Sequence, residues 1–264
     1  MTAERRLALI GYGAMARATM AGLTQRQPSL PATAVLVRSS QYALQRGIAA
    51  FRTVDDLIAW KPDLVAECAS QLAVATNVPA LLAAGIDVII ASIGALADRG
   101  VLQRIEAAAA SGGARFHLVS GGVGGLDCLS AAKLAGLDAV TYVGRKPPRA
   151  WRETPAQAAF DLEAMAKATV IFEGTALDAC RLFPKNANVT AAIALAGIGF
   201  ERTTVRLVAD PDTILNRHEI RAHGRAGEIE VRLSNEALPD NPKTSWLASL
   251  SVEQVVRREL LLSR

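Results

Sequence analysis

The chain has 264 residues, which is enough for one large domain or for two smaller ones with cores of their own. Hydrophobic residues make up 51% and charged residues 20%, so the composition excludes a disordered protein, and no apolar run is long enough to span a membrane. The net charge of +4 is spread along the chain and aromatic residues are few, which favours anionic small molecules over nucleic acid as partners. Three widely spaced cysteines in apolar surroundings indicate reduced thiols and no metal site, and we expect a soluble, cytoplasmic protein.

Strand and helix signals alternate through the first 120 residues. Helices are expected at 74–84 and 100–110, each ending near a glycine, Gly85 or Gly112. Short connections between alternating strands and helices are typical of a doubly wound parallel sheet, so this part is expected to be a Rossmann-type domain. The expected strands are 7–10, 34–37, 64–67, 87–91 and 115–119.

The pattern changes after residue 119. A helical run extends to Leu134, and the paired prolines of TYVGRKPPRAW predict a loop. Strand-like alternation then returns at 203–209, 218–222 and 229–233, which predicts a second α/β domain with a mainly antiparallel sheet. The last segment, SWLASLSVEQVVRREL, is an amphipathic helix. We expect a dinucleotide-binding domain at 1–119, with 240–264 packing back on it, and a second domain at 120–239.

The segment LALIGYGAMA places two glycines between the first strand and the first helix. Gly11 allows a tight turn, and Gly13 lets the backbone approach a pyrophosphate at the helix N-terminus. The third glycine of the usual pattern is replaced by Ala16, an accepted substitute for close helix–strand packing. The loop therefore predicts a nucleotide site, and a simple strand-to-helix turn is the alternative.

The second strand is followed by Arg38, Ser39 and Ser40 rather than by an acidic residue. An Asp or Glu at this place holds the ribose 2′-hydroxyl of NAD, whereas an arginine accommodates the 2′-phosphate of NADP. We therefore expect NADP to be accepted, alongside NAD. A solvated loop arginine is the alternative interpretation of Arg38.

The chain contains only three histidines. His117 lies in an apolar strand and is interpreted as structural. If 218–222 is one strand, His218, Ile220 and Ala222 share the enclosed face, while Glu219 and His223 point to solvent. His218 is thus the candidate catalytic histidine, with a structural role as the alternative.

Two further segments, FPKNANV and NPKTS, combine lysine with amide or hydroxyl side chains just before a helix. Lys185 in the first, or Lys243 with its neighbour Thr244 in the second, could bind an anionic substrate. A cluster of helix-capping residues is the alternative, since Asn is a favoured cap. The sequence does not choose between the two lysines.

Along nearly its whole length the chain contains, in order, the segments GYGAMA, DLVAECAS, ASIGALAD, SGGVGGLD, TYVGRKPPRAW, RLFPKNANV, VRLVADP, NRHEI and NPKTS. In these segments the chain resembles the L-aspartate dehydrogenases. The resemblance implies oxidation of L-aspartate by NAD or NADP to iminosuccinate, which yields oxaloacetate and ammonia or feeds NAD biosynthesis, and the reverse reductive amination. It also implies a homodimer that forms through the second domain.

By the same resemblance the catalytic histidine falls on His218. The cofactor contacts that it implies fall on Gly11, Gly13, Ala14, Met15, Ala69, Gly122 and Asn188. The chain departs from the family at Ser70-Gln71, where Gly-His is common, and at Gly122, where Ala is common. Two other functions remain open from the sequence: a related NAD(P)H-dependent imine or aldehyde reductase of amino-acid metabolism, and a non-catalytic NADP-sensing protein.

Overall fold

The computed structural model describes residues 5–27, 29–38, 47–238 and 241–261; the side chains of residues 185 and 241–243 lie outside this description. The chain divides into two compact units. Unit 1 comprises Met1–Val119 together with Ser249–Arg264, and unit 2 comprises Ser120–Ala248. Each unit is built around a sheet of its own.

Unit 1 contains a six-stranded sheet in which every strand pairs in parallel with its neighbours. The strand order is β3-β2-β1-β4-β5-β6, which is a doubly wound sheet of the Rossmann type. Its central strands are almost entirely buried because helices cover both faces, which is why their sequences are continuously apolar. The strands are β1 (Arg6–Ile10), β2 (Ala32–Leu36), β3 (Ala49–Phe51), β4 (Leu64–Glu67), β5 (Asp87–Ile90) and β6 (Phe116–Leu118).

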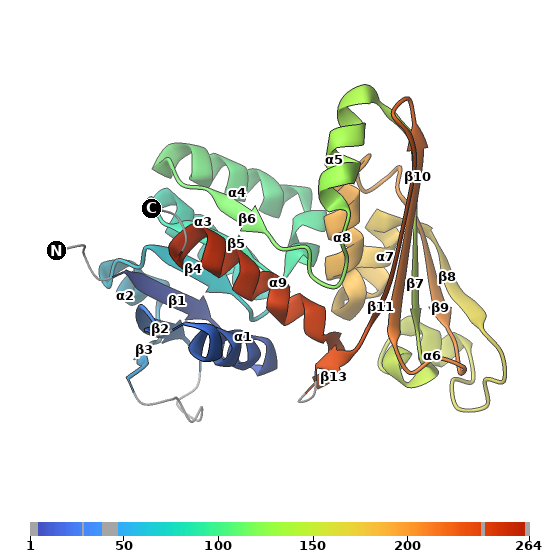
Figure 1. Ribbon diagram of the computed structural model, residues 1–264, viewed down its shortest axis with the longest axis horizontal. Helices are drawn as coiled ribbons and strands as arrows, with labels where there is room; N and C mark the ends of the chain where they lie inside the picture. The colour runs from blue at the N-terminus through green and yellow to red at the C-terminus, as the bar shows by residue number, and fades with distance from the viewer. Residues whose placement is uncertain (1–4, 28, 39–46, 239–240, 262–264) are drawn as a thin grey trace. The chain divides into compact units, whose positions relative to one another are not determined.

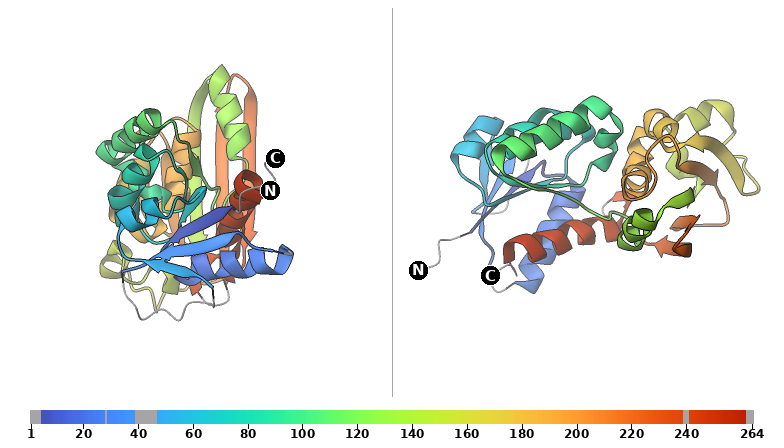
Figure 2. Two further views of the ribbon diagram at one scale, coloured as in Figure 1. Left: turned by 90° about the vertical axis from the view of Figure 1, so that its left-hand side faces the viewer. Right: turned by 90° about the horizontal axis from the view of Figure 1, so that it is seen from above.

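The helices of unit 1 lie in two layers. Figure 2 shows α3 and α4 on one face of the sheet and α1 and α9 on the other. The Asp98 side chain caps α4 by accepting from the backbone N–H groups of Gly100 and Val101, and Gly113 ends this helix in a left-handed conformation. The helical segments are α1 (Ala14–Arg26), α2 (Val54–Ala59), α3 (Gln71–Ala83), η1 (Ile93–Ala97), α4 (Arg99–Gly112), α9 (Trp246–Val256) and η4 (Arg257–Leu261).

Unit 2 contains a five-stranded mixed sheet of order β11-β10-β7-β9-β8. The β7–β9 pair is parallel and the other three pairs are antiparallel, as expected for a mainly antiparallel sheet. The helices α5, α7 and α8 cover one face of it (Figure 1). The strands are β7 (Leu137–Lys146), β8 (Thr169–Thr175), β9 (Thr204–Ala209), β10 (Asn216–Gly224) and β11 (Gly227–Asn235), and β12 (Ala237–Leu238) pairs with β13 (Asn241–Ser245) in a separate ribbon.

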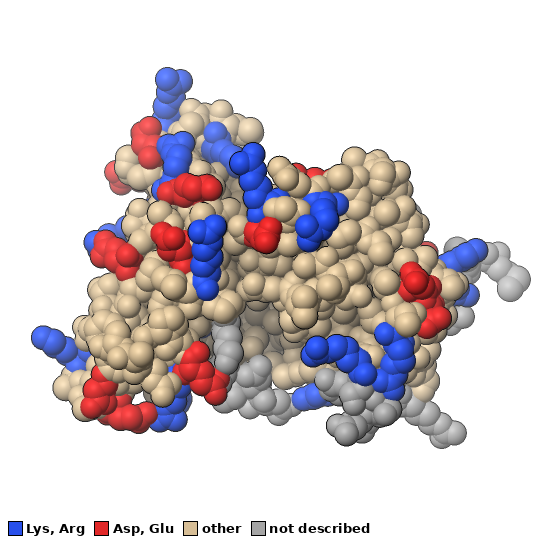
Figure 3. Space-filling model, turned by 180° about the vertical axis from the view of Figure 1, so that it is seen from behind, with Lys and Arg blue, Asp and Glu red and all other residues tan. Residues whose placement is uncertain are grey.

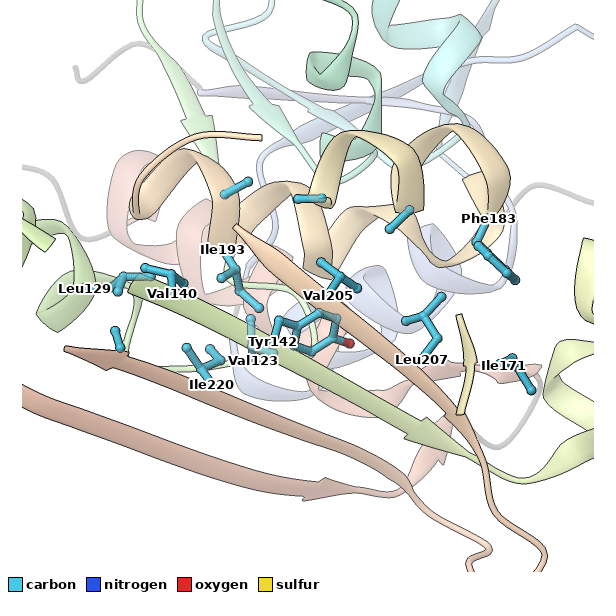
Figure 4. Close-up of a cluster of buried hydrophobic side chains, with 14 of the residues drawn as sticks. Val123, Leu129, Val140, Tyr142, Ile171, Phe183, Ile193, Val205, Leu207 and Ile220 are labelled. Atoms are coloured by element: carbon cyan, nitrogen blue, oxygen red, sulfur yellow. The ribbon is translucent and has the colours of Figure 1, made fainter. Parts of the chain in front are cut away.

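The core of unit 2 lies between this sheet and its helices, which are α5 (Leu126–Ala135), α7 (Ala176–Leu182) and α8 (Ala187–Ala196). The short segments η2 (Pro148–Trp151), α6 (Pro155–Ala159) and η3 (Pro184–Asn186) connect the elements. Alternate residues of β7 and β10 enter the core, and Figure 4 shows the ring of Tyr142 amid apolar side chains. The core is thus apolar around a tyrosine whose hydroxyl needs a partner.

Five strands were not predicted from the sequence: β3, β7, β8, β12 and β13. The largest error concerns β7, since the expected loop in TYVGRKPPRAW begins only at Pro147, after a ten-residue strand. Gly144 and two cations near the strand end conceal its alternation. The segment is nevertheless a central strand of the unit 2 sheet, and it carries residues of the candidate site.

Among the described residues, no helix is long and apolar enough to cross a membrane. On the face shown in Figure 3, Lys and Arg side chains are interspersed with Asp and Glu rather than gathered into a patch of one sign. This distribution agrees with the spread of charge in the sequence.

Candidate functional site

The glycine loop of unit 1 follows β1 directly. Gly11 has φ +83°, a conformation that favours glycine, and its backbone N–H donates to Leu36 O at 2.9 Å. A Cβ atom at Gly11 would lie only 2.7 Å from the Cβ of Ala69. Gly11 is therefore required both by the turn and by the close approach of Ala69, which follows β4.

The N-terminus of α1 is open at Gly13. Gly13 occupies the cap position without a side-chain hydrogen bond, and the first turn contains no acidic residue. No atom lies within 4 Å of the place that a Cβ of Gly13 would take, whereas Ala16 is fully buried. The first turn of α1, which holds Ala14 and Met15, thus has no side-chain cap and has open space at Gly13, and such a terminus fits a pyrophosphate.

A buried carboxylate binds the segment after β4 that packs on the glycine loop. Glu67, at the end of β4, is fully buried, and its Oε1 accepts from the N–H groups of Ala69 (2.7 Å) and Ser70 (2.9 Å) and from Ser92 Oγ (3.0 Å). Its Oε2 accepts from the Ser92 N–H at 2.9 Å. Burial raises the pKa of Glu67, while these hydrogen bonds lower it in part. Glu67 was not predicted as a site residue, although a lone acid at the end of an apolar strand is a visible signal in the sequence.

The other predicted residues of unit 1 lie near the same edge of the sheet. Arg38 is exposed and follows β2, while Ser39 and Ser40 lie outside the described residues. Ser70, one of the two departures from the family pattern, caps α3 by accepting from the Ala73 N–H at 3.2 Å. The departure at Ser70 thus supplies a helix cap.

In unit 2, His218 lies on the enclosed face of β10, as the alternation predicted. The residue is only 4% exposed, and its Nδ1 lies 2.9 Å from the Tyr142 hydroxyl. Its Nε2 is buried and has no hydrogen-bond partner among the described residues. Burial, together with the charge of Lys146, lowers the pKa of His218 to about 3, so the ring is neutral near pH 7.

Polar groups surround this unpartnered nitrogen. A Cβ atom at Gly122 would lie 3.3 to 3.4 Å from His218 Nε2, Asn235 Nδ2 and Ser245 Oγ, so all three atoms face Gly122. Asn235 Nδ2 donates to Gly122 O at 2.6 Å, and Asn216 Nδ2 lies 3.4 Å from Ser245 Oγ. An apolar core would not hold this set of donors and acceptors, which indicates a binding site.

A lysine lies close to the same cluster. Lys146, at the end of β7, donates to Asn186 Oδ1 at 2.6 Å, and its ammonium group lies 5.7 Å from the ring centroid of Trp151. Loss of solvent lowers the pKa of Lys146 to about 8. Tyr142, Lys146, Asn186, Asn216, Asn235 and Ser245 were not predicted as site residues.

The remaining predicted site residues differ in burial, and two of their side chains lie outside the described residues. Gly122 is buried beside His218, and Asn188 is partly buried on α8. Thr244 is partly buried on β13, whereas the side chains of Lys185 and Lys243 lie outside the described residues. The described part of the chain holds no group of three or more metal-binding side chains.

A separate hollow of about 250 Å³ is lined by charged residues of β7, β10 and β11, including Arg145, Arg217 and Arg232. His218 contributes to its lining, but Arg217 directly precedes His218 in β10, so the Arg217 side chain points to the opposite face. Arg145 is moreover engaged with Asp210 at 2.8 Å. This hollow is therefore distinct from the polar cluster around His218 Nε2.

Both units match known protein families. Residues 127–259 match the family described as "Aspartate dehydrogenase, C-terminal", and residues 11–119 match "Homoserine dehydrogenase, NAD binding domain". An L-aspartate dehydrogenase of Cupriavidus necator is 43% identical over 254 residues, which is 93% of this chain and 94% of the relative. One from Ralstonia nicotianae is 52% identical over 192 residues, covering 73% of this chain and 72% of the relative.

The crystal structure of the aspartate dehydrogenase from Thermotoga maritima superposes with a TM-score of 0.75. The two chains are 27% identical, and the match covers 98% of this chain and 97% of the other. The doubly wound NAD-binding unit, the polar cluster around a buried histidine and these full-length matches lead to one conclusion: the chain belongs to the L-aspartate dehydrogenase family.

Proposed function

We propose that this chain is an NAD(P)-dependent dehydrogenase that oxidises L-aspartate to iminosuccinate, which water converts to oxaloacetate and ammonia, and that it also catalyses the reverse reductive amination. The observation that carries this proposal is the buried, neutral His218, whose Nε2 lies in a polar cluster without a hydrogen-bond partner among the described residues. The chain matches an L-aspartate dehydrogenase over 93% of its length.

The cofactor is NAD or NADP, and unit 1 is the unit that binds it. We assign the pyrophosphate to the open N-terminus of α1 at Gly13, Ala14 and Met15, where free N–H groups and the helix dipole favour an anion. Gly11 and Ala69 form the adjoining turn. Arg38 is the candidate for the NADP 2′-phosphate, because it is exposed after β2 and takes the place of an acidic residue.

In the reaction the bound nicotinamide supplies a hydride acceptor for the hydrogen on the substrate Cα. The protein's own task is to move protons. We propose that His218 Nε2 accepts a proton from the water that adds to the imine carbon, and that it then donates this proton to the departing amine. A neutral imidazole is able to do this when its Nδ1–H donates to the Tyr142 hydroxyl, since Nε2 then carries the free lone pair.

Gly122, Asn188 and Thr244 are proposed to contact cofactor or substrate, as are Lys185 and Lys243. Gly122 is the best supported of them because it lies against His218, Asn235 and Ser245. We further propose a homodimer formed through unit 2, and a cytoplasmic location, where nicotinamide cofactors and aspartate are both available.

A panel of L- and D-amino acids, each tested with NAD and with NADP, examines the proposed reaction. Absorbance of the reduced nicotinamide should rise with L-aspartate, and NADP should be accepted. An imine or aldehyde reductase would not oxidise aspartate. A non-catalytic sensor protein would not reduce the cofactor with any of the amino acids. Either result would overturn the proposal.

The His218→Ala variant tests the proposed proton transfer. Turnover should fall by a factor on the order of 10² or more, the scale of general acid–base catalysis, while the affinity for the cofactor stays unchanged. His223→Ala is the matched control, because His223 is exposed on the other face of the same strand. Near-normal turnover of His218→Ala would remove this residue from the mechanism.

A further inference from the structure

Lys146 is a partly buried cation that has no carboxylate partner among the described residues. Three arginines of the unit 2 sheet have carboxylate partners: Arg145 contacts Asp210 at 2.8 Å, Arg206 contacts Glu173 at 2.8 Å, and Arg221 contacts Glu219 at 2.6 Å. Within the described part of the chain, Lys146 has only the neutral Asn186 oxygen and the Trp151 ring near its ammonium group. A cation removed from water without an anion destabilises the fold, so its presence points to a ligand.

The position of Lys146 is tied to that of His218. On β7, Tyr142, Gly144 and Lys146 alternate onto the face that carries His218, and Gly144 is the residue directly opposite His218 on β10. Lys146 is therefore a diagonal neighbour of His218, and such neighbours lie about 7–8 Å apart in a sheet. The charge of Lys146 also lowers the pKa of His218, so the two groups interact.

The ammonium group of Lys146 has more N–H donors than its hydrogen bond to Asn186 uses. Of its three N–H donors, the hydrogen bond to Asn186 Oδ1 uses one and fixes its direction. A carboxylate could accept from the others while its own charge replaces the missing counter-charge. L-Aspartate carries two carboxylates a short distance from its amine, so one molecule is able to reach both Lys146 and His218.

We propose that Lys146 binds a carboxylate of the amino-acid substrate and that Asn186 is the positioning residue that holds its ammonium group toward that carboxylate. This inference rests on the proposed function. It has a consequence for His218: a bound carboxylate neutralises the charge of Lys146, and the histidine then becomes a stronger base only when substrate is present.

The test compares Lys146→Met with wild type, with Lys167→Met as the matched control in an exposed loop of the same unit. Lys146→Met should raise the KM for L-aspartate by about 10- to 100-fold, the range of a charge-assisted hydrogen bond, and leave the KM for the cofactor unchanged. Asn186→Asp should also raise the KM for L-aspartate at least tenfold, because its carboxylate would occupy the ammonium group.

A binding measurement separates this inference from the proposed function. Calorimetric titration with succinate, in the presence of NADP, should show binding to wild type and to Lys167→Met, and at least tenfold weaker binding to Lys146→Met. If wild type fails to oxidise L-aspartate but binds succinate through Lys146, the proposed function falls and the carboxylate site stands. Unchanged KM and unchanged succinate affinity in Lys146→Met would overturn the inference.

Folding and pH supply two further readouts. Methionine replaces a partly buried, unpaired charge with an apolar chain of similar length, so the midpoint of thermal unfolding should not fall. If it does fall, Asn186→Asp carries the test. In wild type, kcat/KM should decline above about pH 8, because Lys146 loses its proton there. The side chains near its ammonium group are His218, Asn186 and Trp151. Lys146→Arg keeps its charge and should move this decline to higher pH, a change that a purely structural lysine would not produce.

Discussion

The hydrogen bond between Tyr142 and His218 orients the histidine in the core of unit 2. The hydroxyl lies against the backbone of Gly144, where a Cβ atom would come within 2.6 Å of it. Burial raises the pKa of Tyr142, so the phenol stays neutral and can accept the Nδ1–H of the ring. The orientation of His218 therefore depends on a glycine that leaves room for this hydroxyl.

Tyr142→Phe removes that acceptor and leaves the ring volume in place. Turnover should fall by roughly tenfold, because a single hydrogen bond contributes about 0.5–1.5 kcal/mol and here it selects the reactive tautomer. Steady-state kinetics of the single and double variants measure the effect. In a His218→Ala background the same substitution should have no further effect on turnover, and an additive loss would contradict the orienting role.

His218 could be predicted from the sequence because strand alternation is local information. The contacts that give it meaning were not predictable, since Tyr142 is 76 residues away and Lys146 meets Asn186 across 40 residues. A lysine just before two prolines looks like a loop residue until the strand partners of β7 are known. The histidine was thus visible in the sequence, but the charge next to it was not.

At the scale of elements, three loops at the edge of the unit 1 sheet meet through two contacts. Glu67 joins the β4–α3 loop to the segment after β5 through Ser92, and Ala69 lies against the turn at Gly11. Helix α4 was predictable because Asp98 and the glycines at its end are explicit signals. The loop arrangement was not, because it depends on one carboxylate that collects donors from separate strands.

Glu67→Gln tests this arrangement. The amide replaces one acceptor oxygen with a donor that faces a backbone N–H, so the free energy of unfolding should fall by about 1–3 kcal/mol. The KM for the cofactor should rise, because the Gly11 turn packs on Ala69. Thermal unfolding and cofactor titration measure both effects, with Glu106→Gln on the exposed side of α4 as the control. A variant with unchanged stability and cofactor affinity would show that Glu67 does not support the loop.

At the scale of the whole chain, unit 1 is assembled from two segments that are far apart in the sequence. Helix α9 joins α1 through Glu253, which is only 4% exposed and contacts Arg26 Nη1 with both carboxylate oxygens, at 3.0 and 3.1 Å. Gly22 leaves the space for this carboxylate, because a Cβ there would clash with Glu253. The sequence indicated an amphipathic last helix but not this ion pair.

Arg26→Ala leaves the carboxylate of Glu253 without its partner. The free energy of unfolding should fall by about 1–3 kcal/mol, less than for a fully buried pair, because the Arg26 side chain is 45% exposed. A neighbouring cavity of about 370 Å³ also lets water approach the pair. Chemical denaturation measures the loss against Arg104→Ala, an exposed arginine of α4. Equal stability of the two variants would mean that the ion pair does not hold α9 in place.

The two-segment construction of unit 1 has a consequence for synthesis on the ribosome. Unit 2 is one continuous stretch, so its whole sheet is available once residue 248 has left the exit tunnel. Most of α9 and all of η4 reach unit 1 only after that point, long after its strand β1 has emerged. During synthesis, the α9-binding face of α1 therefore stays uncovered until α9 has left the exit tunnel.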